Sequence, residues 1–154
     1  MDTTLLSNFA HIRRPDLLQL TLEENAATVP TVMEELRTGE DLGLVPPCDW
    51  SWLQILELTD EEQRLADELK QQLDPGEAEC LAVAQMRQSK ILSDDFAARR
   101  LARQRKITVS GTLGVLLALV DEEHLTLEEA DRFLAVMISH GYRSPVQSLQ
   151  ELLR

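Results

Sequence analysis

Residues 90–109 read KILSDDFAARRLARQRKITV, and this stretch decides the fold class. A short apolar run over 90–93 meets an aspartate pair, a helical pattern follows to about Arg105, and a β-branched run closes the stretch at 107–109. Short apolar runs bounded by polar residues are typical of buried strands. Two strands joined by a helix form a parallel, normally right-handed βαβ unit. The stretch therefore predicts the α/β class, with a parallel sheet covered by helices.

The sequence on either side adds more helices than strands. The expected elements are a helix over 17–22, a strand over 26–29, a helix from Pro30, a loop over 39–49, a strand over 53–58, a helix from Thr59 to Leu73, a helix beginning near Glu77, and helices over 111–120, 126–140 and 145–153. The chain has 154 residues, which suits one domain of ordinary size with a continuous core. We find no internal repeat, so we expect a single domain.

Charge and hydropathy narrow the classes of function. The formal net charge is −12, from 27 acidic and 15 basic residues, which disfavours indiscriminate nucleic-acid binding because phosphate contacts need Lys and Arg. A local basic patch and a cationic protein partner both stay open. No apolar run approaches the ~20 residues that span a bilayer, so we expect no membrane segment. Cys48 and Cys80 lack metal-ligand spacing and predict reduced thiols in a cytoplasmic protein.

Carboxylates mark the ends of the expected strands, where ligands bind in parallel sheets. Asp94 and Asp95 leave the strand at 90–93. Helix capping explains one of them, because Asp is a favoured cap. Two adjacent carboxylates repel each other unless a cation lies between them, so a divalent-metal site is the alternative interpretation.

Further acids stand at comparable places. Glu77 opens a helix, and Glu79 lies on a different face of that helix. Glu34 and Glu35 lie in the middle of a helix, while Asp2 suits the exit of a strand. Taken singly, each of these acids is explained as a cap or as solvated surface.

A basic cluster follows the aspartate pair: Arg99, Arg100, Arg103, Arg105 and Lys106. Arg99 and Arg103 share a helix face, with Arg100 beside them. Phosphate contact next to a metal site and a solvated helix face explain this cluster equally well.

Gly111 to Gly114 form a tight strand-to-helix turn around Thr112. Such a turn can offer backbone N–H groups to a phosphate, although close packing is the commoner use of its glycines. Thr112 is a candidate site residue because it follows a strand end. The histidines at 11, 124 and 140 are too widely spaced for a zinc pattern, and we expect them at the surface or in loops.

Five segments together resemble the PIN-like nuclease family, closest to the VapC-like branch long filed as a domain of unknown function. They are DTTLLSNF at 2–9, VPTVMEEL at 29–36, DPGEAECLAVA at 74–84, ILSDDFAARRLA at 91–102 and VSGTLGVLL at 109–117. The resemblance covers essentially the whole chain. It implies a single PIN-like domain over 1–154, a three-layer α/β fold whose short central parallel sheet is flanked by helices.

The resemblance also implies a site of three or four acids that holds Mg²⁺ or Mn²⁺, ions that prefer carboxylate and water oxygens. By position, it assigns catalysis to Asp2, Glu35, Glu77 and Asp95, metal binding to Asp2, Glu77, Asp94 and Asp95, and substrate contacts to Arg99, Arg103, Thr112 and Ser7, with Asn8 as a further polar residue near the first acid. The family has an apolar strand before its first acid. Asp2 follows Met1 directly, so we expect the first strand to be shortened before Asp2.

The implied activity is the hydrolysis of RNA phosphodiesters by a metal-dependent ribonuclease, as the toxin of a toxin–antitoxin pair whose antitoxin is a small protein. A homodimer is also implied, with the C-terminal helices around Phe133, Met137 and Tyr142 as its surface. The alternative is a PIN-like domain without catalysis that acts as a binding module, because fold alone does not settle function.

Overall fold

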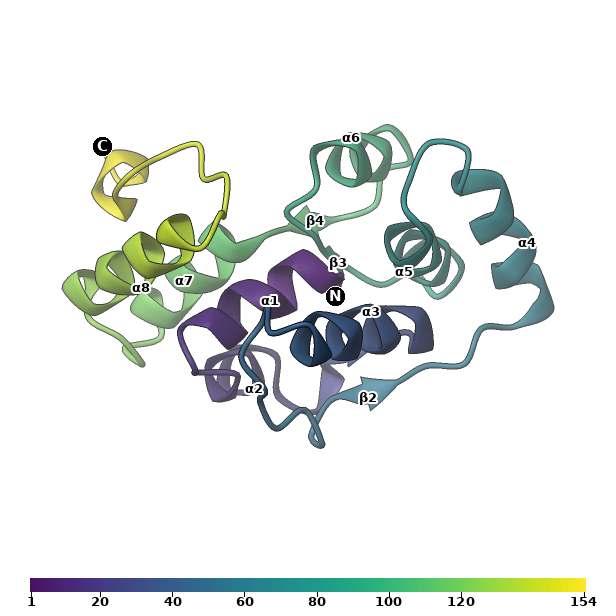
Figure 1. The fold of residues 1–154 in the computed structure, drawn as a ribbon. Helices are drawn as coiled ribbons and strands as arrows, with labels where there is room; N and C mark the ends of the chain where they lie inside the picture. Colours follow the sequence, from purple (N-terminus) through teal and green to yellow (C-terminus); the bar gives the residue numbers. More distant parts are fainter.

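The computed structural model describes residues 1–154, with eight α-helices and four strands of two residues each, and confirms the α/β class. The elements are α1 Thr3–His11, α2 Asp16–Leu22, β1 Ala27–Thr28, α3 Pro30–Asp41, β2 Gln54–Ile55, α4 Asp60–Leu69, α5 Pro75–Met86, β3 Ile91–Leu92, α6 Phe96–Gln104, β4 Val109–Ser110, α7 Thr112–Asp121 and α8 Leu127–Ser139, with 3₁₀ turns at Glu23–Asn25 and Leu149–Leu152. Figure 1 shows their arrangement.

The strands form two parallel pairs, β1 with β2 and β3 with β4. In the second pair Ile91 lies opposite Val109 and Leu92 opposite Ser110, with α6 as the connection. The βαβ unit predicted from residues 90–109 is therefore confirmed. Strand β3 is followed directly by the polar turn Ser93–Asp95, and β4 by Gly111, the N-cap residue of α7.

Met1 and Asp2 join the two strand pairs. Met1 N donates to Ala27 O at 3.0 Å, and the Thr28 hydroxyl donates to Met1 O at 2.7 Å. On the other side, Asp2 N donates to Leu92 O at 3.1 Å. These two residues thus lie between β1 and β3, in the middle of the molecule, where Figure 1 marks the N-terminus. The shortened first strand stays a prediction.

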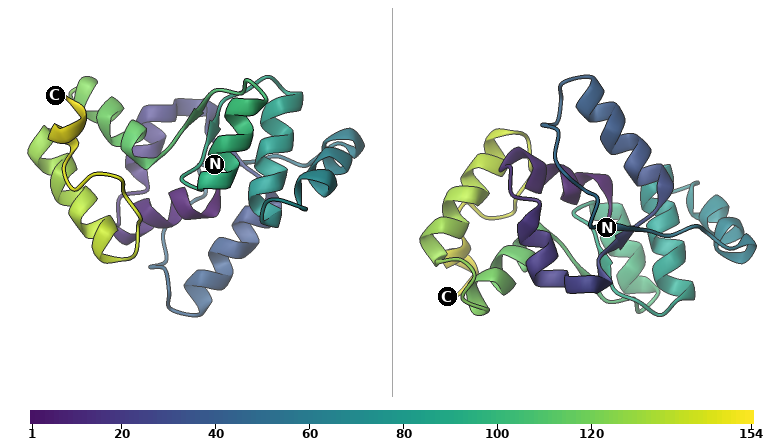
Figure 2. Two further views of the ribbon diagram at one scale, coloured as in Figure 1. Left: turned by 90° about the horizontal axis from the view of Figure 1, so that it is seen from above. Right: turned by 90° about the horizontal axis from the view of Figure 1, so that it is seen from below.

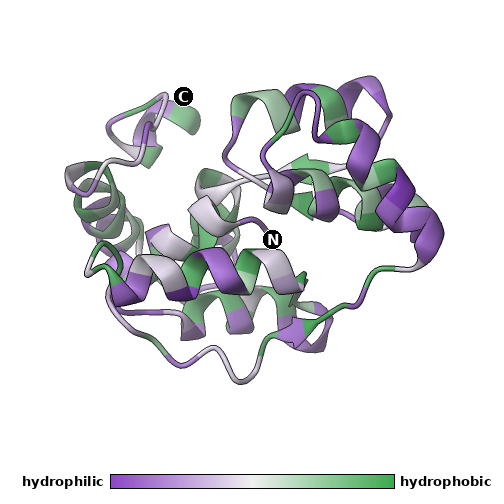
Figure 3. Cartoon of the chain, turned by 45° about the vertical axis from the view of Figure 1, so that its right-hand side comes forward, coloured by the Kyte–Doolittle hydropathy of each residue, from purple (hydrophilic) through white to green (hydrophobic).

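Helices surround the short strands. Figures 1 and 2 show α5 and α6 on one side and α1 to α3 on the other, with α7 and α8 at one end of the molecule and α4 at the opposite end. Helix α5 is covered almost all round, with Ala78 to Ala84 buried without a break, as expected for a helix enclosed by other elements. Helix α4 is largely hydrophilic and peripheral (Figure 3). No helix combines the length and the apolarity needed to cross a membrane.

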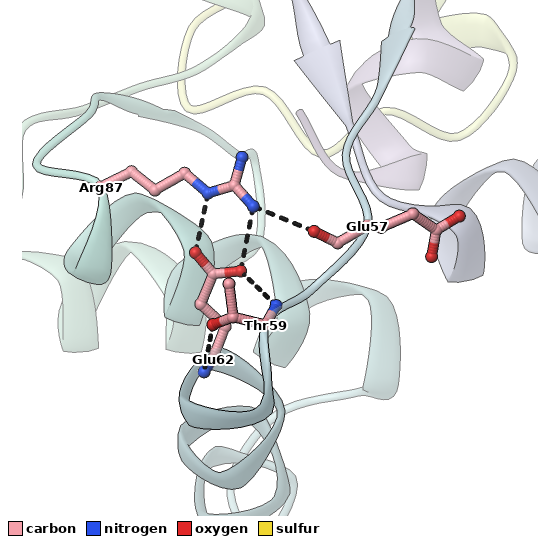
Figure 4. A network of polar contacts seen from close by, with 4 residues as sticks. All are labelled: Glu57, Thr59, Glu62 and Arg87. Carbon is pink, nitrogen blue, oxygen red and sulfur yellow. Dashed lines mark hydrogen bonds and ion pairs between the residues drawn. The ribbon is translucent and has the colours of Figure 1, made fainter.

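Arg87 fastens the start of α4 to the end of α5 (Figure 4). The predicted capping box at Thr59 is present, with Glu62 as its reciprocal partner. The Glu62 side chain is 3% exposed, and its Oε1 lies 2.7 Å from Arg87 Nε. Arg87 also donates to the Glu57 backbone carbonyl at 3.0 Å. A charge this well covered needs such a partner, because burial without one is costly.

The structure differs from the sequence predictions at three places, and it adds helix α1, for which the sequence predicted no element. The strand expected over 53–58 contains only Gln54–Ile55, and α3 continues to Asp41, into the predicted loop. The helix predicted over 145–153 was wrong, because only the 3₁₀ turn Leu149–Leu152 forms there. Ser148 accounts for this last difference. Its hydroxyl accepts from Gln150 N and donates to Asp131, so side-chain bonds replace the helical ladder.

The residues predicted to form a dimer surface mostly make contacts within their own chain. Met137 is fully buried in the core, and the Tyr142 hydroxyl lies 3.5 Å from Asp94 Oδ1. Phe133 is partly buried against the same core. These three side chains therefore serve packing within the protomer.

Candidate active site

Asp2 is the most deeply buried of the predicted site acids, with 1% of its surface exposed. It caps α1, because Asp2 Oδ1 accepts from Leu5 N at 3.0 Å. The Ser93 hydroxyl donates to Asp2 Oδ2 from the end of β3. Burial raises the pKa of Asp2 from 3.8 to about 6, against the opposing effect of these two hydrogen bonds. The carboxylate is thus fixed between α1 and β3.

Asp95 caps α6 through a 2.8 Å bond from Ala98 N to Asp95 Oδ2, which confirms the capping interpretation for this residue. Its own N–H donates to the Ser93 hydroxyl at 3.1 Å. Ser93 therefore holds both Asp2 and Asp95 in place. The sequence had not marked this serine, although its position at the strand end was a usable signal.

Asp94 is hydrogen-bonded to Thr112 and Asn8, and not to Ser93. Thr112 N donates to Asp94 Oδ1 at 2.8 Å, the Thr112 hydroxyl donates to Oδ2, and Asn8 Nδ2 donates to Oδ2 at 3.2 Å. Arg99 lies beside it and donates to the Ser93 carbonyl at 2.9 Å. Burial raises the pKa of Asp94, while the bonds from Thr112 and the charge of Arg99 lower it. Hydrogen bonds and a guanidinium thus offset the like charge of the neighbouring Asp95.

Glu77 lies half-buried in the first turn of α5. Its pKa rises from 4.5 to about 7, first through burial and then through the negative charges of Asp95, Asp2 and Asp74. The negative charges of Asp95 and Asp2 thus contribute to the raised pKa of Glu77, although the three acids come from separate parts of the chain. Asp95 follows the end of β3 and Asp2 is hydrogen-bonded to that end through Ser93, whereas Glu77 approaches from the start of α5. That these acids form one site stays a prediction.

Glu35 reaches the start of α5 from α3. The Thr3 hydroxyl donates to Glu35 Oε2. A Cβ atom at Gly76 would lie 2.9 Å from that same oxygen, so only glycine lets the carboxylate lie so close to the helix start. Glu34 is exposed, whereas Glu79 is 7% exposed and lies 3.6 Å from Lys70. The carboxylate of Glu35 and that of Glu77 thus lie at the start of α5, whereas Glu34 points to solvent and Glu79 to Lys70.

The acids fit a divalent cation that keeps much of its water. No three His, Cys, Asp or Glu side chains are grouped closely enough to hold an ion by themselves. The donors of the cluster are all oxygens, and Mg²⁺ is commonly held by one or two carboxylates plus water. Glu77 and Asp95, with Asp2 beneath them, are the side chains whose charges such an ion would neutralise.

A polar cavity of about 500 Å³ opens beside the acids. It is lined by Thr3, Thr4, Ser7, Asn8, His11, Asp94, Asp95, Phe96, His140, Gly141, Tyr142 and Arg143. The His11 and His140 rings stack in it with centroids 4.4 Å apart. The histidine pair, Tyr142 and Arg143 had no signal in the sequence, because only the fold brings the end of α8 to α1.

A second cavity, of about 490 Å³, lies around Met1 between β1 and β3. It is mainly apolar, and no Asp or Glu lines it. It therefore offers no comparable chemistry, and the polar cavity is the candidate cleft.

The predicted substrate residues fall into two groups. Ser7 lines the cleft, whereas Thr112 is fully buried in the Asp94 network that Arg99 also supports. Arg103 is exposed on α6. Their roles in binding substrate stay predictions.

The sequence matches the family described as DUF3368, a PIN domain, over residues 1–154. No curated protein and no solved structure gives a significant match. The match spans the α/β fold, the acids at the strand ends and the cleft beside them. The chain therefore belongs to the PIN domain family.

Proposed function

We propose that the protein is a ribonuclease that requires Mg²⁺ or Mn²⁺ and hydrolyses RNA phosphodiesters at the cluster of Asp2, Glu77 and Asp95. The observation that carries this proposal is the raised pKa of Glu77, to which burial and the negative charges of Asp95 and Asp2 contribute, together with the polar cleft that Asp95 lines. Perturbed carboxylates in a cleft are typical of functional sites. The PIN domain family supports a nuclease-type reaction.

Each residue of the cluster has a defined task in this proposal. A bound divalent cation supplies charge neutralisation at the phosphoryl group and a more acidic water. The pKa of Glu77 is raised to about 7, so a cation held by this carboxylate would compete with a proton there. Ser93 orients Asp2 through its hydroxyl, and Thr3 orients Glu35. Asp95 caps α6 and so fixes the start of this helix next to the other acids.

The proposal extends to the biological setting that the sequence implies. The protein would act in the cytoplasm as the toxin of a pair, restrained by a small antitoxin protein, and would form a homodimer. The net charge of −12 suits a cationic antitoxin.

A binding module without catalysis is the second candidate, and one observation favours it. Both oxygens of Asp2 and one oxygen of Asp95 already accept hydrogen bonds within the chain. Fewer lone pairs are thus left for a cation than four free carboxylates would offer.

Cleavage of a labelled single-stranded RNA with Mn²⁺, compared with the same reaction in EDTA, tests the proposal. Asp95→Asn is the informative variant, because Asn is an equally good helix cap and so preserves the fold while removing the charge. Glu77→Gln is the second variant, and Asp121→Asn, at an exposed site far from the cluster, is the matched control. We expect metal-dependent cleavage by the wild type and the control, and at least a tenfold loss in both site variants.

Two results would overturn the proposal. The first is equal cleavage with Mn²⁺ and with EDTA, and the second is full activity of both site variants, which would point to a contaminating nuclease. Absence of cleavage together with intact RNA binding would support the binding module instead.

A further inference from the structure

We infer that Phe96 and Arg100, on the outer face of α6, form a subsite for single-stranded RNA, with a nucleobase stacked on the Phe96 ring and a backbone phosphate at Arg100. The inference rests on the proposed function, because it names the form of RNA that the acid cleft would receive. The sequence pattern assigned no role to Phe96, and for the basic cluster that contains Arg100 it left phosphate contact and a solvated helix face as alternatives.

The exposure of Phe96 is the first observation. Its side chain is 77% exposed, more than any other large hydrophobic residue of the chain, while Phe9 is fully buried and Trp50 is 7% exposed. An aromatic ring left in water forgoes the free energy that its burial would contribute. Its flat face is thus free to stack against another ring.

Its position is the second observation. Phe96 directly follows Asp95 and lines the polar cleft together with both aspartates of the pair. It also lines a neighbouring hollow of about 330 Å³, formed with Gln72, Ala97, Arg100, Leu101 and Gln104. The ring therefore stands between the acids and a second depression along α6, where a strand leaving the cleft would pass.

Charge is the third observation. Arg100 lies four residues after Phe96 and so shares its helix face. Its side chain is exposed and forms no ion pair, and no Asp or Glu lines the hollow beside it. In a chain with a net charge of −12, such a surface is unusual. A cation next to an exposed aromatic ring is the pattern that binds single strands without sequence preference.

The single-stranded form follows from geometry. A base in a duplex is already stacked on both faces, so only an unpaired base can lie on the Phe96 ring. The same exposed ring could instead contact another protein, and the experiment below separates the two occupants.

Binding is measured in EDTA by the fluorescence anisotropy of a labelled oligouridine, so that the result does not depend on cleavage. Phe96→Ala is compared with Phe96→Trp and with Leu44→Ala, the last at a site of 67% exposure beyond the end of α3. We expect Phe96→Ala to weaken binding roughly five- to a hundredfold, the worth of one stacked base. Phe96→Trp should restore binding, and Leu44→Ala should leave it unchanged.

Arg100→Gln tests the phosphate contact through the salt dependence of RNA affinity. We expect the slope of log affinity against log salt to fall by about 0.7, as for the loss of one phosphate contact on a single strand. Arg132→Gln, at an exposed residue of α8, should leave the slope unchanged. A duplex of oligouridine with oligoadenine should bind more weakly than the single strand and should not respond to Phe96→Ala.

Unchanged affinity of Phe96→Ala overturns the inference, and so does equal binding of duplex and single strand. A change in the mass of the protein by light scattering, with no change in RNA affinity, would assign the ring to a protein contact and also overturn it. Wild-type binding that depends on Phe96 but is never followed by cleavage with Mn²⁺ supports the subsite while the proposed catalysis fails.

Discussion

Thr112 and Asp94 are joined by two hydrogen bonds, one from the Thr112 backbone N–H and one from its hydroxyl. The pair connects the turn before α6 to the first residue of α7. Asn8 joins the same network from α1, at 3.1 Å from the Thr112 hydroxyl. Three helices are thus held together around one partly buried carboxylate.

Thr112→Val should therefore destabilise the protein although it preserves the shape of the side chain. The variant removes the two hydrogen bonds of the Thr112 hydroxyl, with Asp94 and Asn8, while the bond from the backbone N–H at 112 and the bond between Asn8 and Asp94 remain. A lost hydrogen bond to a charged group costs about 1.5–3 kcal/mol. Urea unfolding followed by circular dichroism measures the free energy of unfolding. Thr108→Val, at an exposed site, is the control. Equal stability of the two variants would contradict the structural role of the Asp94 network.

The stability contributed by Glu77 should depend on pH. The pKa of Glu77 is about 7 in the folded chain, compared with an ordinary value of 4.5 for a glutamate in the unfolded chain. The folded state therefore binds more protons than the unfolded state between about pH 4.5 and 7, so the free energy of unfolding falls as the pH rises through this window. Asp2, with a pKa of about 6, acts in the same direction.

Glu77→Gln isolates this effect because glutamine cannot ionise. The stability of the variant relative to the wild type should rise steadily from pH 5 to pH 8, as judged by chemical unfolding at each pH. Glu61→Gln, at an exposed site in α4, should show no such trend. If the difference in free energy of unfolding between Glu77→Gln and the wild type did not change with pH, burial and the acidic neighbours would not raise the pKa of Glu77.

Mg²⁺ should stabilise the folded chain by binding to the same acids. At ten times the dissociation constant, binding contributes about 1.4 kcal/mol, which corresponds to a rise in the unfolding midpoint of a few degrees. The rise should be larger at pH 8 than at pH 6, since protons compete for Glu77. Differential scanning fluorimetry with and without Mg²⁺ measures it. Asp95→Asn should abolish the response; persistence of the full shift in that variant would place the cation elsewhere.

Arg87→Met should be clearly destabilising, because it leaves the covered carboxylate of Glu62 without its partner. We expect a loss of about 1–3 kcal/mol in the free energy of unfolding. The double variant with Glu62→Gln should lose less than the sum of the two single variants, since the pair interacts directly. Arg132→Met, whose ion pair with Glu128 is exposed at 3.9 Å, is the control. Additive losses would show that Arg87 and Glu62 are not coupled.

The sequence predicts those parts of the fold that local patterns determine. Residues 90–109 identify the βαβ unit because apolar runs, an aspartate cap and a helical pattern follow one another there. The capping box at Thr59 is equally local. Strands of two residues are too short for any periodicity, so the extent of β2 was overestimated. The end of the chain was misread because serine side chains compete with helical hydrogen bonds, which hydrophobic spacing does not reveal.

The candidate site shows the same division. Positions at strand ends and family resemblance select Asp2, Glu77 and Asp95, and in the structure the charges of Asp95 and Asp2 contribute to the raised pKa of Glu77. The cleft wall around His11, His140 and Tyr142 depends on contacts between the two ends of the chain. No pattern along the sequence encodes such contacts, because they arise only when α8 folds back toward α1.

Met1 and Asp2 carry the backbone hydrogen bonds that span β1 and β3, and Asp2 also supplies the most buried acid. Asp2 thus belongs both to the candidate site and to the connection between the two strand pairs. A local opening between the strand pairs would displace Asp2 from Ser93 while every helix remained formed. A local opening between the two strand pairs would therefore disrupt the acid cluster before the helices unfold. Any activity of the cluster would then be lost at temperatures where the helical circular dichroism signal is still intact.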